Sequence, residues 1–563
     1  MISPDFTERV EVLRIRFVFC FLCGLLFVGS VHAAHIMVVH PPMFRDSLQP
    51  WIQYRSEQGH TIHLLETNRE TGEADILAAI RNLAHENPLE AVLLVGDTYS
   101  PSLEVETIPS PRIPAKVIGQ FGKEQDIASD TVYGDLDDDG LPDITVGRFS
   151  VQSAAELDAM IRKTIRYENR ENPGPWLRRI NFIAGVGGFS AILDGSIESA
   201  ARFILSQTIP AEYDITLTQS DVKSPYCPAP SRFRNETIAR LNEGSLFWVY
   251  MGHGMRQRLD SVSCPEQPNH IFPIFSKGDA EYVSCSRGLP IALLLCCYTG
   301  ALDSDENCVA EELHRRENGP VAVFAASRTT MPYGMCTLGI ELIEETFKPR
   351  TSEEPLTLGN VILTAKRNSM LRKTARRPNG KERPIREVVD SLAKMLDPTA
   401  NRLEEQRFDH VHLFQLFGDP LLRLPTPITI LLDAPETAKA NTTINVRGVL
   451  PDTGKSDDGK MVREKRRVVV ELAVPKARNT VFSPKNRTFD LTEESVQEFN
   501  TLYAEANRRV VSRVIIDVPE GRTFSAELPI PGFSRNEKGD YDLRVYYETA
   551  NSYGLGSRTI SVK

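Results

Sequence analysis

The sequence predicts an α/β fold, in which open, mostly parallel sheets are flanked by helices, followed by an all-β sandwich. Near-continuous apolar runs such as "AVLLV" (91–95) and "IALLL" (291–295) are typical of strands buried on both faces of a parallel sheet. Segments with a helical period separate these runs, which is the order of βαβ units. After Pro425 the helical period gives way to alternation, as in "DYDLRVYYE" (540–548).

Residues 1–33 are predicted to be a signal peptide. Two arginines precede an apolar run over residues 17–28, and the small residues Val31 and Ala33 follow it. About twelve apolar residues are too few to span a bilayer. We therefore expect an exported chain, secreted or in the cell envelope, with no transmembrane segment after processing.

Residues 34–175 are predicted to form an N-terminal α/β subdomain. Its expected strands cover residues 35–40, 60–66, 90–97 and 143–149. Between the second and third, Ile76, Ile80 and Leu83 fall on one face of a helix. Ser153 and Glu156 form a capping box that begins the helix after the fourth.

Residues 176–425 are predicted to form a second α/β subdomain, which carries the chemistry. Its expected strands cover residues 180–186, 244–252, 290–296 and 319–327. Helices are expected near residues 197–205 and 308–315, and "HVH" (410–412) reads as part of a strand.

Residues 426–563 are predicted to form an immunoglobulin-like β-sandwich, with one helical pattern near 492–507. Such a sandwich is a candidate for surface or protein contacts. The overall composition, 41% hydrophobic and 25% charged, is that of a soluble globular protein. A formal charge of −10 argues against a nucleic-acid partner.

Residue types used in nucleophilic catalysis follow two of the predicted strands. "LFWVYMGHG" ends in His253 between two glycines, and "PIALLLCC" ends in Cys296 and Cys297. Reactive groups gather at the carboxyl ends of parallel strands, so an imidazole could activate a thiol there. The amide of Gly254 could donate to an oxyanion. The alternative is that the cysteines are core residues and "GHG" is only a turn.

An ordered set of motifs resembles the gingipain-like cysteine peptidases, peptidase family C25 of the caspase–hemoglobinase clan. The set covers about residues 35–425, and the resemblance implies a caspase-like fold. Its members here are "VLLVGD" (92–97), "SDTVYGD" (129–135), "VGRFS" (146–150), "YMGHG" (250–254), "CCYTG" (296–300), "CVAEEL" (308–313) and "LFGDP" (416–420).

The resemblance implies specific roles at the two strand ends. Matching the family's Cys-x-x-Gly to residues 297–300 makes Cys297 the nucleophile, with Cys296 buried on the opposite face. His253 would act as general base and acid, and the amides of Gly254 and Cys297 would form the oxyanion hole. The reaction implied is hydrolysis of protein or peptide substrates through an acyl-enzyme.

Two positions depart from the family's pattern. Val186 stands where the family has a glutamate that assists the histidine, and Ile197 stands where arginine-specific members place an aspartate. We therefore do not expect arginine specificity. The second hypothesis is a catalytically impaired member that acts as a surface or secretion-associated binding protein.

The stretch "GDLDDDGLPD" (134–143) is a candidate calcium loop. Its expected ligands are the side chains of Asp135, Asp137, Asp139 and Asp143 and the carbonyl of Leu141. Oxygen ligands at alternate positions with a glycine for the sharp turn suit Ca²⁺, whose role would be structural. The alternative is a solvated acidic turn.

Overall fold

The computed structural model describes residues 34–98, 106–171, 173–185, 208–350, 354–371, 384–397, 399–450, 466–478, 487–518, 523–534, 537–549 and 552–563. Their contacts define two compact units. The α/β unit takes in residues 34–425 and the segment 479–507. The β unit takes in residues 426–478 and 508–563.

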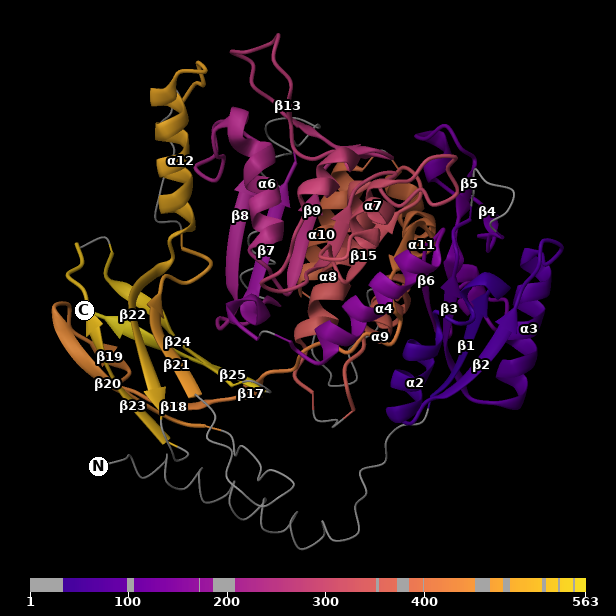
Figure 1. Cartoon of the computed structure of the whole chain (residues 1–563). Coiled ribbons are helices and arrows are strands. Elements are labelled where there is room, and N and C mark those ends of the chain that lie inside the picture. The colour runs from indigo at the N-terminus through magenta and orange to yellow at the C-terminus, as the bar shows by residue number, and fades with distance from the viewer. Residues whose placement is uncertain are drawn as a thin grey trace, which may run out of the picture. The chain divides into compact units, whose positions relative to one another are not determined.

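A ten-stranded sheet forms the centre of the α/β unit (Figure 1), in the order β2-β1-β3-β6-β16-β15-β14-β9-β7-β8. The strands from β2 to β16 run parallel to one another, and so do those from β15 to β8. The two halves meet at β15 and β16, which are antiparallel. The predicted α/β fold of mostly parallel strands flanked by helices is confirmed.

The first half of the sheet comes from the N-terminal part of the chain and from β16. Its elements are β1 (His35–His40), α2 (Gln49–Glu57), β2 (Thr61–Glu66), α3 (Glu73–Glu86), β3 (Leu89–Val95), β4 (Arg112–Pro114), β5 (Asp126–Ala128), β6 (Thr145–Phe149) and α4 (Ala154–Glu168). The Ser153 hydroxyl accepts a hydrogen bond from the amide of Glu156, 3.3 Å away, and so caps α4 as expected.

The second half carries the predicted chemistry. Its strands are β7 (Arg179–Ala184), β8 (Asp214–Gln219), β9 (Phe247–Met251), β14 (Ile291–Leu295) and β15 (Ala322–Ala326). Two hairpins outside the sheet, β10 (Gly254–Met255) with β11 (Arg258–Leu259) and β12 (Ser261–Val262) with β13 (Phe272–Pro273), lie between β9 and β14 in the sequence, and β16 (Phe414–Phe417) of the first half follows later. Its helices are α6 (Phe233–Asn242), α7 (Val309–Arg315), α8 (Pro332–Phe347), α9 (Leu358–Met370), α10 (Pro384–Leu396) and α11 (Leu403–Leu413). In the described part of the chain, no helix has the length and apolar character needed to cross a membrane.

The prediction of a strand at "HVH" is wrong. His410 and His412 lie in the last turn of α11, and the strand begins only at Phe414. Both imidazoles are buried and bonded to backbone: His410 Nε2 accepts from the amide of Met331, and His412 Nε2 donates to the carbonyl of Gly140. Both histidines therefore contribute to the packing of the fold.

The β unit contains a six-stranded and a three-stranded sheet. Its strands are β17 (Ile428–Thr429), β18 (Leu431–Asp433), β19 (Thr437–Ala438), β20 (Thr442–Val449), β21 (Arg466–Ala473), β22 (Val510–Val518), β23 (Thr523–Ile530), β24 (Gly539–Glu548) and β25 (Tyr553–Val562). Both sheets contribute to one core, in which Val446 and Leu528 of the smaller sheet join Val470 and Val545 of the larger. The all-β character predicted for the C-terminal region is confirmed.

One helix from the C-terminal part of the sequence belongs to the α/β unit. This helix, α12 (Glu493–Asn507), lies against β8, the last strand of the ten-stranded sheet (Figure 1). The Tyr503 hydroxyl is 2.8 Å from that of Thr218. The Asn507 side chain accepts from the amide of Leu217 at 2.9 Å and donates to its carbonyl at 3.0 Å. The Asn507 side chain thus makes the two hydrogen bonds to Leu217 that a neighbouring strand would make.

Candidate active site

His253 and Cys297 leave the sheet at the same edge, from neighbouring strands. β9 and β14 pair in parallel, with Met251 opposite Leu295. His253 and Cys297 are each the second residue after that pair. Strand pairing therefore brings together two residues that are 44 positions apart in the sequence.

The loop after β9 packs directly on the loop after β14. A Cβ atom on Gly254 would lie 2.6 Å from the carbonyl oxygen of Cys297 and 2.8 Å from the Sγ of Cys296. No side chain fits at these distances, so glycine is required for the close approach. On the other side, Gly185 follows β7, and its amide donates to the Met251 carbonyl at 2.8 Å.

Burial distinguishes the two adjacent cysteines. Cys296 is fully buried, its Sγ lies 3.4 Å from the hydroxyl of Thr299, and burial raises the pKa of its thiol. Cys297 is partly exposed. Because only a thiolate reacts efficiently, a buried thiol of raised pKa is the poorer nucleophile of the pair.

The Cys297 thiol is held by the loop that follows β15. Its Sγ accepts a hydrogen bond from the amide of Thr330 at 3.2 Å and lies 3.4 Å from the Thr330 hydroxyl. No hydrogen bond joins this sulfur to the His253 imidazole within the described residues. Cys297 thus lies between Thr330, which follows one neighbouring strand, and His253, which follows the other.

His253 is exposed, and its backbone is fixed by a buried tyrosine. The hydroxyl of Tyr250, in β9, donates to the His253 carbonyl at 2.7 Å. Burial raises the pKa of Tyr250, which keeps its hydroxyl protonated and able to donate. Sequence reasoning gave no role to Tyr250, although this residue begins the quoted motif "YMGHG". It also missed Thr330, because nothing in the loop "SRTTMP" indicates a contact with Cys297.

Two further predicted positions lie outside the described residues. Val186, in the place of the family's assisting glutamate, directly follows Gly185, where description stops. Ile197, in the place of the specificity aspartate, lies in the same undescribed range of 186–207. The predicted helix near 197–205 lies there too.

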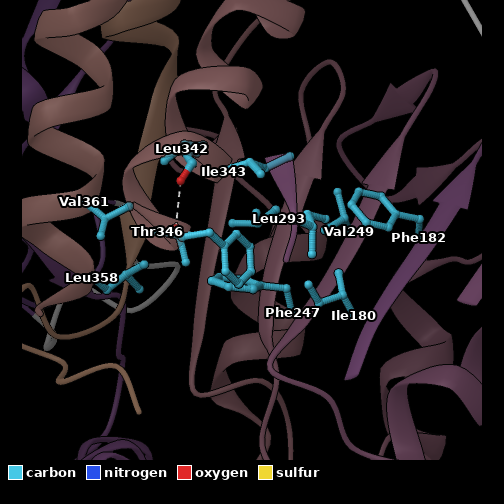
Figure 2. A pocket seen from close by; sticks show the side chains of 12 residues that line it. Ile180, Phe182, Phe247, Val249, Leu293, Leu342, Ile343, Thr346, Leu358 and Val361 are labelled. Carbon is cyan, nitrogen blue, oxygen red and sulfur yellow. Dashed lines mark hydrogen bonds between the residues drawn. The ribbon is translucent and has the colours of Figure 1, made fainter. Parts of the chain in front are cut away.

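An apolar pocket opens on one face of the second half of the sheet, away from the two strand ends. Figure 2 shows side chains of β7, β9 and β14 facing those of α8 and α9 across it. Its only labelled polar side chain, Thr346, donates its hydroxyl to the Leu342 carbonyl at 2.7 Å. The lining contains no nucleophile or base, so this pocket is not the site of the predicted chemistry.

The acidic loop brings three of its predicted ligands together. One carboxylate oxygen from each of Asp135, Asp137 and Asp143 lies within 4.8 Å of the others. Asp139 is not in this group; its Oδ1 accepts from the Leu141 amide at 2.7 Å. Carboxylate oxygens that converge in this way suit a hard cation.

Other groups partly compensate the charge of this loop. Arg367 lies 2.8 Å from Asp143 Oδ1, and Arg81 pairs with the exposed Asp138 at 3.0 Å. Burial raises the pKa of Asp135, whose carboxylate accepts from the amides of Asp138 and Gly140. The three carboxylates fit a cation. The two arginines also offset part of the negative charge, so the loop can fold without a cation.

A thiol and an imidazole on neighbouring strand ends of a mostly parallel sheet are the two groups that a cysteine peptidase uses. The model of peptidase family C25 matches residues 30–425, which is more than half of the 563-residue chain. The chain belongs to peptidase family C25. The resemblance inferred from the motifs is thereby confirmed.

Two gingipains are similar to this chain in sequence. Gingipain R2 of Porphyromonas gingivalis is 22% identical over 527 residues, which cover 89% of this chain and 62% of that protein. Lys-gingipain HG66 of the same species is 24% identical over 304 residues, 52% of this chain and 15% of the relative. The chain thus spans less than two thirds of either.

The crystal structure of the Arg specific cysteine proteinase gingipain R (RGPB) has the same fold. It aligns with a TM-score of 0.53 at 17% identity, over 95% of this chain and 99% of that chain. At this identity the likeness shows the fold alone.

Proposed function

We propose that the protein is an exported cysteine endopeptidase that hydrolyses protein or peptide substrates. The observation that carries the proposal is the contact of the His253 loop with the Cys297 loop, through Gly254, at one edge of the sheet. The proposed location, secreted or in the cell envelope, rests on the signal-peptide pattern of residues 1–33.

The proposed reaction proceeds in two steps. His253 takes the proton of the Cys297 thiol, and the thiolate attacks the substrate carbonyl carbon. The amides of Gly254 and Cys297 would donate to the oxyanion, and His253 then protonates the leaving amine. Water, deprotonated by the same imidazole, hydrolyses the acyl-enzyme and restores the thiol.

We propose a dyad without the family's assisting acid. Valine at position 186 can neither accept a hydrogen bond from an imidazole nor stabilise its positive charge. The Tyr250 bond to the His253 carbonyl supports the orientation of that loop by another route. Ile197 offers no charge for an arginine side chain, so we propose a preference other than arginine.

Labelling with a peptidyl electrophile tests the dyad. We expect the wild type to be modified once, at Cys297, and Cys297→Ala to remain unmodified. His253→Ala should react at least about a hundredfold more slowly, because the general base is lost. His270→Ala, at a largely exposed histidine outside the dyad, is the matched control and should react like the wild type.

The second candidate is a catalytically impaired binding protein. The missing acid at Val186 favours it, and the C-terminal β unit would supply the binding surface. A wild type that is not labelled and cleaves nothing in a broad peptide mixture would support this candidate against the peptidase.

We also propose that Asp135, Asp137 and Asp143 hold a structural Ca²⁺. The convergence of three carboxylates supports it, since like charges at this distance repel without a cation. Asp139 and the Leu141 carbonyl, also expected as ligands, have no such support. The loop lies in the N-terminal half, so the ion would stabilise the fold and take no part in hydrolysis.

A further inference from the structure

A glutamate from the N-terminal half of the α/β unit connects the two catalytic loops. Glu124 lies between η2 (Ile118–Gln120) and β5, far in sequence from both loops. One of its carboxylate oxygens is 2.7 Å from the Arg256 guanidinium, and the other accepts the Tyr298 hydroxyl at 2.8 Å. Arg256 is three residues beyond His253, and Tyr298 directly follows Cys297.

Tyr298 needs support from its surroundings. Its φ of 57° is in the left-handed region, which a bulky side chain adopts only when other contacts compensate. Its amide donates to the Arg328 carbonyl, and its hydroxyl accepts from that of Thr329 at 3.2 Å. Glu124 completes this set, and burial raises the pKa of Tyr298, so that the phenol donates to the carboxylate.

Arg256 connects the histidine loop to the same carboxylate. It lies in the short hairpin of β10 and β11, which begins at Gly254. Its carbonyl accepts from the amide of Val309, the first residue of α7, at 2.9 Å. Its guanidinium lies 5.8 Å from the centre of the Tyr298 ring, so the two partners of Glu124 also face each other.

The segment that precedes Glu124 is anchored to α11 by hydrogen bonds. The buried carboxylate of Asp409, in α11, accepts from the amides of Lys116, Val117 and Ile118 at 2.6 to 3.0 Å. A Cβ atom on Gly122 would lie 3.1 Å from the Tyr298 hydroxyl, so this loop reaches the cysteine loop through backbone as well. These contacts limit the positions that the Glu124 side chain can take.

We propose that Glu124 is a positioning residue that fixes the loop of His253 relative to the loop of Cys297. This inference rests on the proposed function of that pair and adds a residue to it from outside the sheet edge. The carboxylate acts through Arg256 on one loop and through Tyr298 on the other. Because position 186 supplies no acid to orient His253, this connection is what fixes the position of the His253 loop relative to the Cys297 loop.

Three variants and a control test the proposal on the full-length protein. Glu124→Ala should lower kcat by about ten- to a hundredfold with little change in KM, because a small displacement of reacting groups has effects of this size. Tyr298→Phe should lower kcat in the same direction, and the double variant should be no slower than Glu124→Ala. Glu317→Gln removes an exposed ion pair, with Arg162 of α4, and should stay within about twofold of the wild type.

Additive effects of Glu124→Ala and Tyr298→Phe, or unchanged kcat in Glu124→Ala, would overturn the proposal. If Glu124→Ala does not fold, Glu124→Gln replaces it. The amide keeps an acceptor for Tyr298 but not the charge opposite Arg256, so kcat should still fall; wild-type kcat would overturn the proposal.

If the wild-type protein shows no peptidase activity, the proposed function is wrong, but the positioning role of Glu124 can still be tested. The readout is then the rate at which iodoacetamide alkylates Cys297, followed by mass spectrometry of the modified peptide. Glu124→Ala and Tyr298→Phe should each change that rate by about two- to tenfold, without adding. Equal rates in the wild type and both variants would show that Glu124 does not position Cys297.

Discussion

The amide nitrogen of Thr330 lies 3.2 Å from the Sγ of Cys297, and the hydroxyl of the same threonine lies 3.4 Å from that sulfur. Hydrogen bonds donated to a thiolate stabilise it against the thiol. Thr330 comes from the strand on the opposite side of β14 from His253. The Cys297 sulfur is therefore hydrogen-bonded on the side of β15, and the loop of His253 lies on the other side.

We predict that Thr330→Val, which keeps the shape and the amide but removes the hydroxyl, slows the reaction of Cys297. A hydrogen bond to a charged group contributes about 1.5 kcal/mol, which corresponds to about a tenfold loss. The measurement is kcat/KM on a peptide, or the rate of labelling by the peptidyl electrophile. Thr346→Val, whose hydroxyl bonds only within α8, is the control. Equal losses in both variants would argue against a specific role of Thr330.

The neighbouring cysteine, Cys296, is predicted not to react with alkylating reagents in the folded protein. Cys296 is fully buried and burial raises the pKa of its thiol, so it should not be alkylated near neutral pH in the folded protein. Cys296→Ala should therefore keep wild-type labelling at Cys297, with some loss of stability from the smaller side chain. Peptide mapping after labelling checks this, and modification at position 296 in the native protein would contradict it.

The acidic loop gives a prediction with a matched pair of variants. If Ca²⁺ binds Asp135, Asp137 and Asp143, a free Ca²⁺ concentration of about a hundred times the Kd of this site should add about 2.7 kcal/mol to the free energy of unfolding. A chelator should lower Tm, and added Ca²⁺ should restore it. Asp137→Asn should abolish this response, whereas Asp138→Asn, outside the cluster and 82% exposed, should keep it. Loss of the response in both variants, or in neither, would count against this ligand set.

A buried lysine should make stability depend on pH above neutrality. Lys163, in α4, donates to the carbonyls of His314 and Arg316, and burial lowers the pKa of its amine from 10.5 to about 7. Between these two values the unfolded chain binds one more proton than the folded chain. The stability that Lys163 contributes therefore rises as the pH increases from 7 to 10.5, and it is lost as the pH falls back to 7, below which both states hold the proton.

Denaturant unfolding of the wild type and of Lys163→Met between pH 7 and 8.5 measures this effect. The difference between their free energies of unfolding should increase with pH, by up to about 1.4 kcal/mol per pH unit. Lys277→Met, at a more accessible lysine, should show no such trend. Parallel curves for the wild type and Lys163→Met would rule out titration of this amine in that range.

The strands, and the pairing that brings the loops of His253 and Cys297 together, could be predicted because they depend on local pattern. The runs ending at Met251 and Leu295 are apolar throughout, and parallel pairing carries whatever follows them to one edge. The direction of the two halves of the sheet could not be predicted, since hydrophobicity does not encode whether β15 and β16 run parallel or antiparallel.

Two of the motifs that carry the family resemblance end in or contain carboxylates, Asp97 and Asp419, that hold the fold together. Asp97 pairs with Arg315 at 2.8 Å, and Asp419 pairs with the fully buried Arg55 at 2.6 Å. Conversely, Glu124 stands in an unremarkable loop and lies 174 residues from its partner Tyr298. Contacts of such range depend on the finished fold, so no local pattern indicates them.

The helix α12 means that the boundary at Pro425 in the sequence is not a boundary of the folded α/β unit. The two hydrogen bonds of Asn507 satisfy both backbone groups of Leu217 on the outermost strand, β8. A chain cut after Pro425 would leave that strand open to pairing with other chains, which is how sheet proteins aggregate. We therefore expect the peptidase-family region to need this segment of the C-terminal sequence to cover its outermost strand.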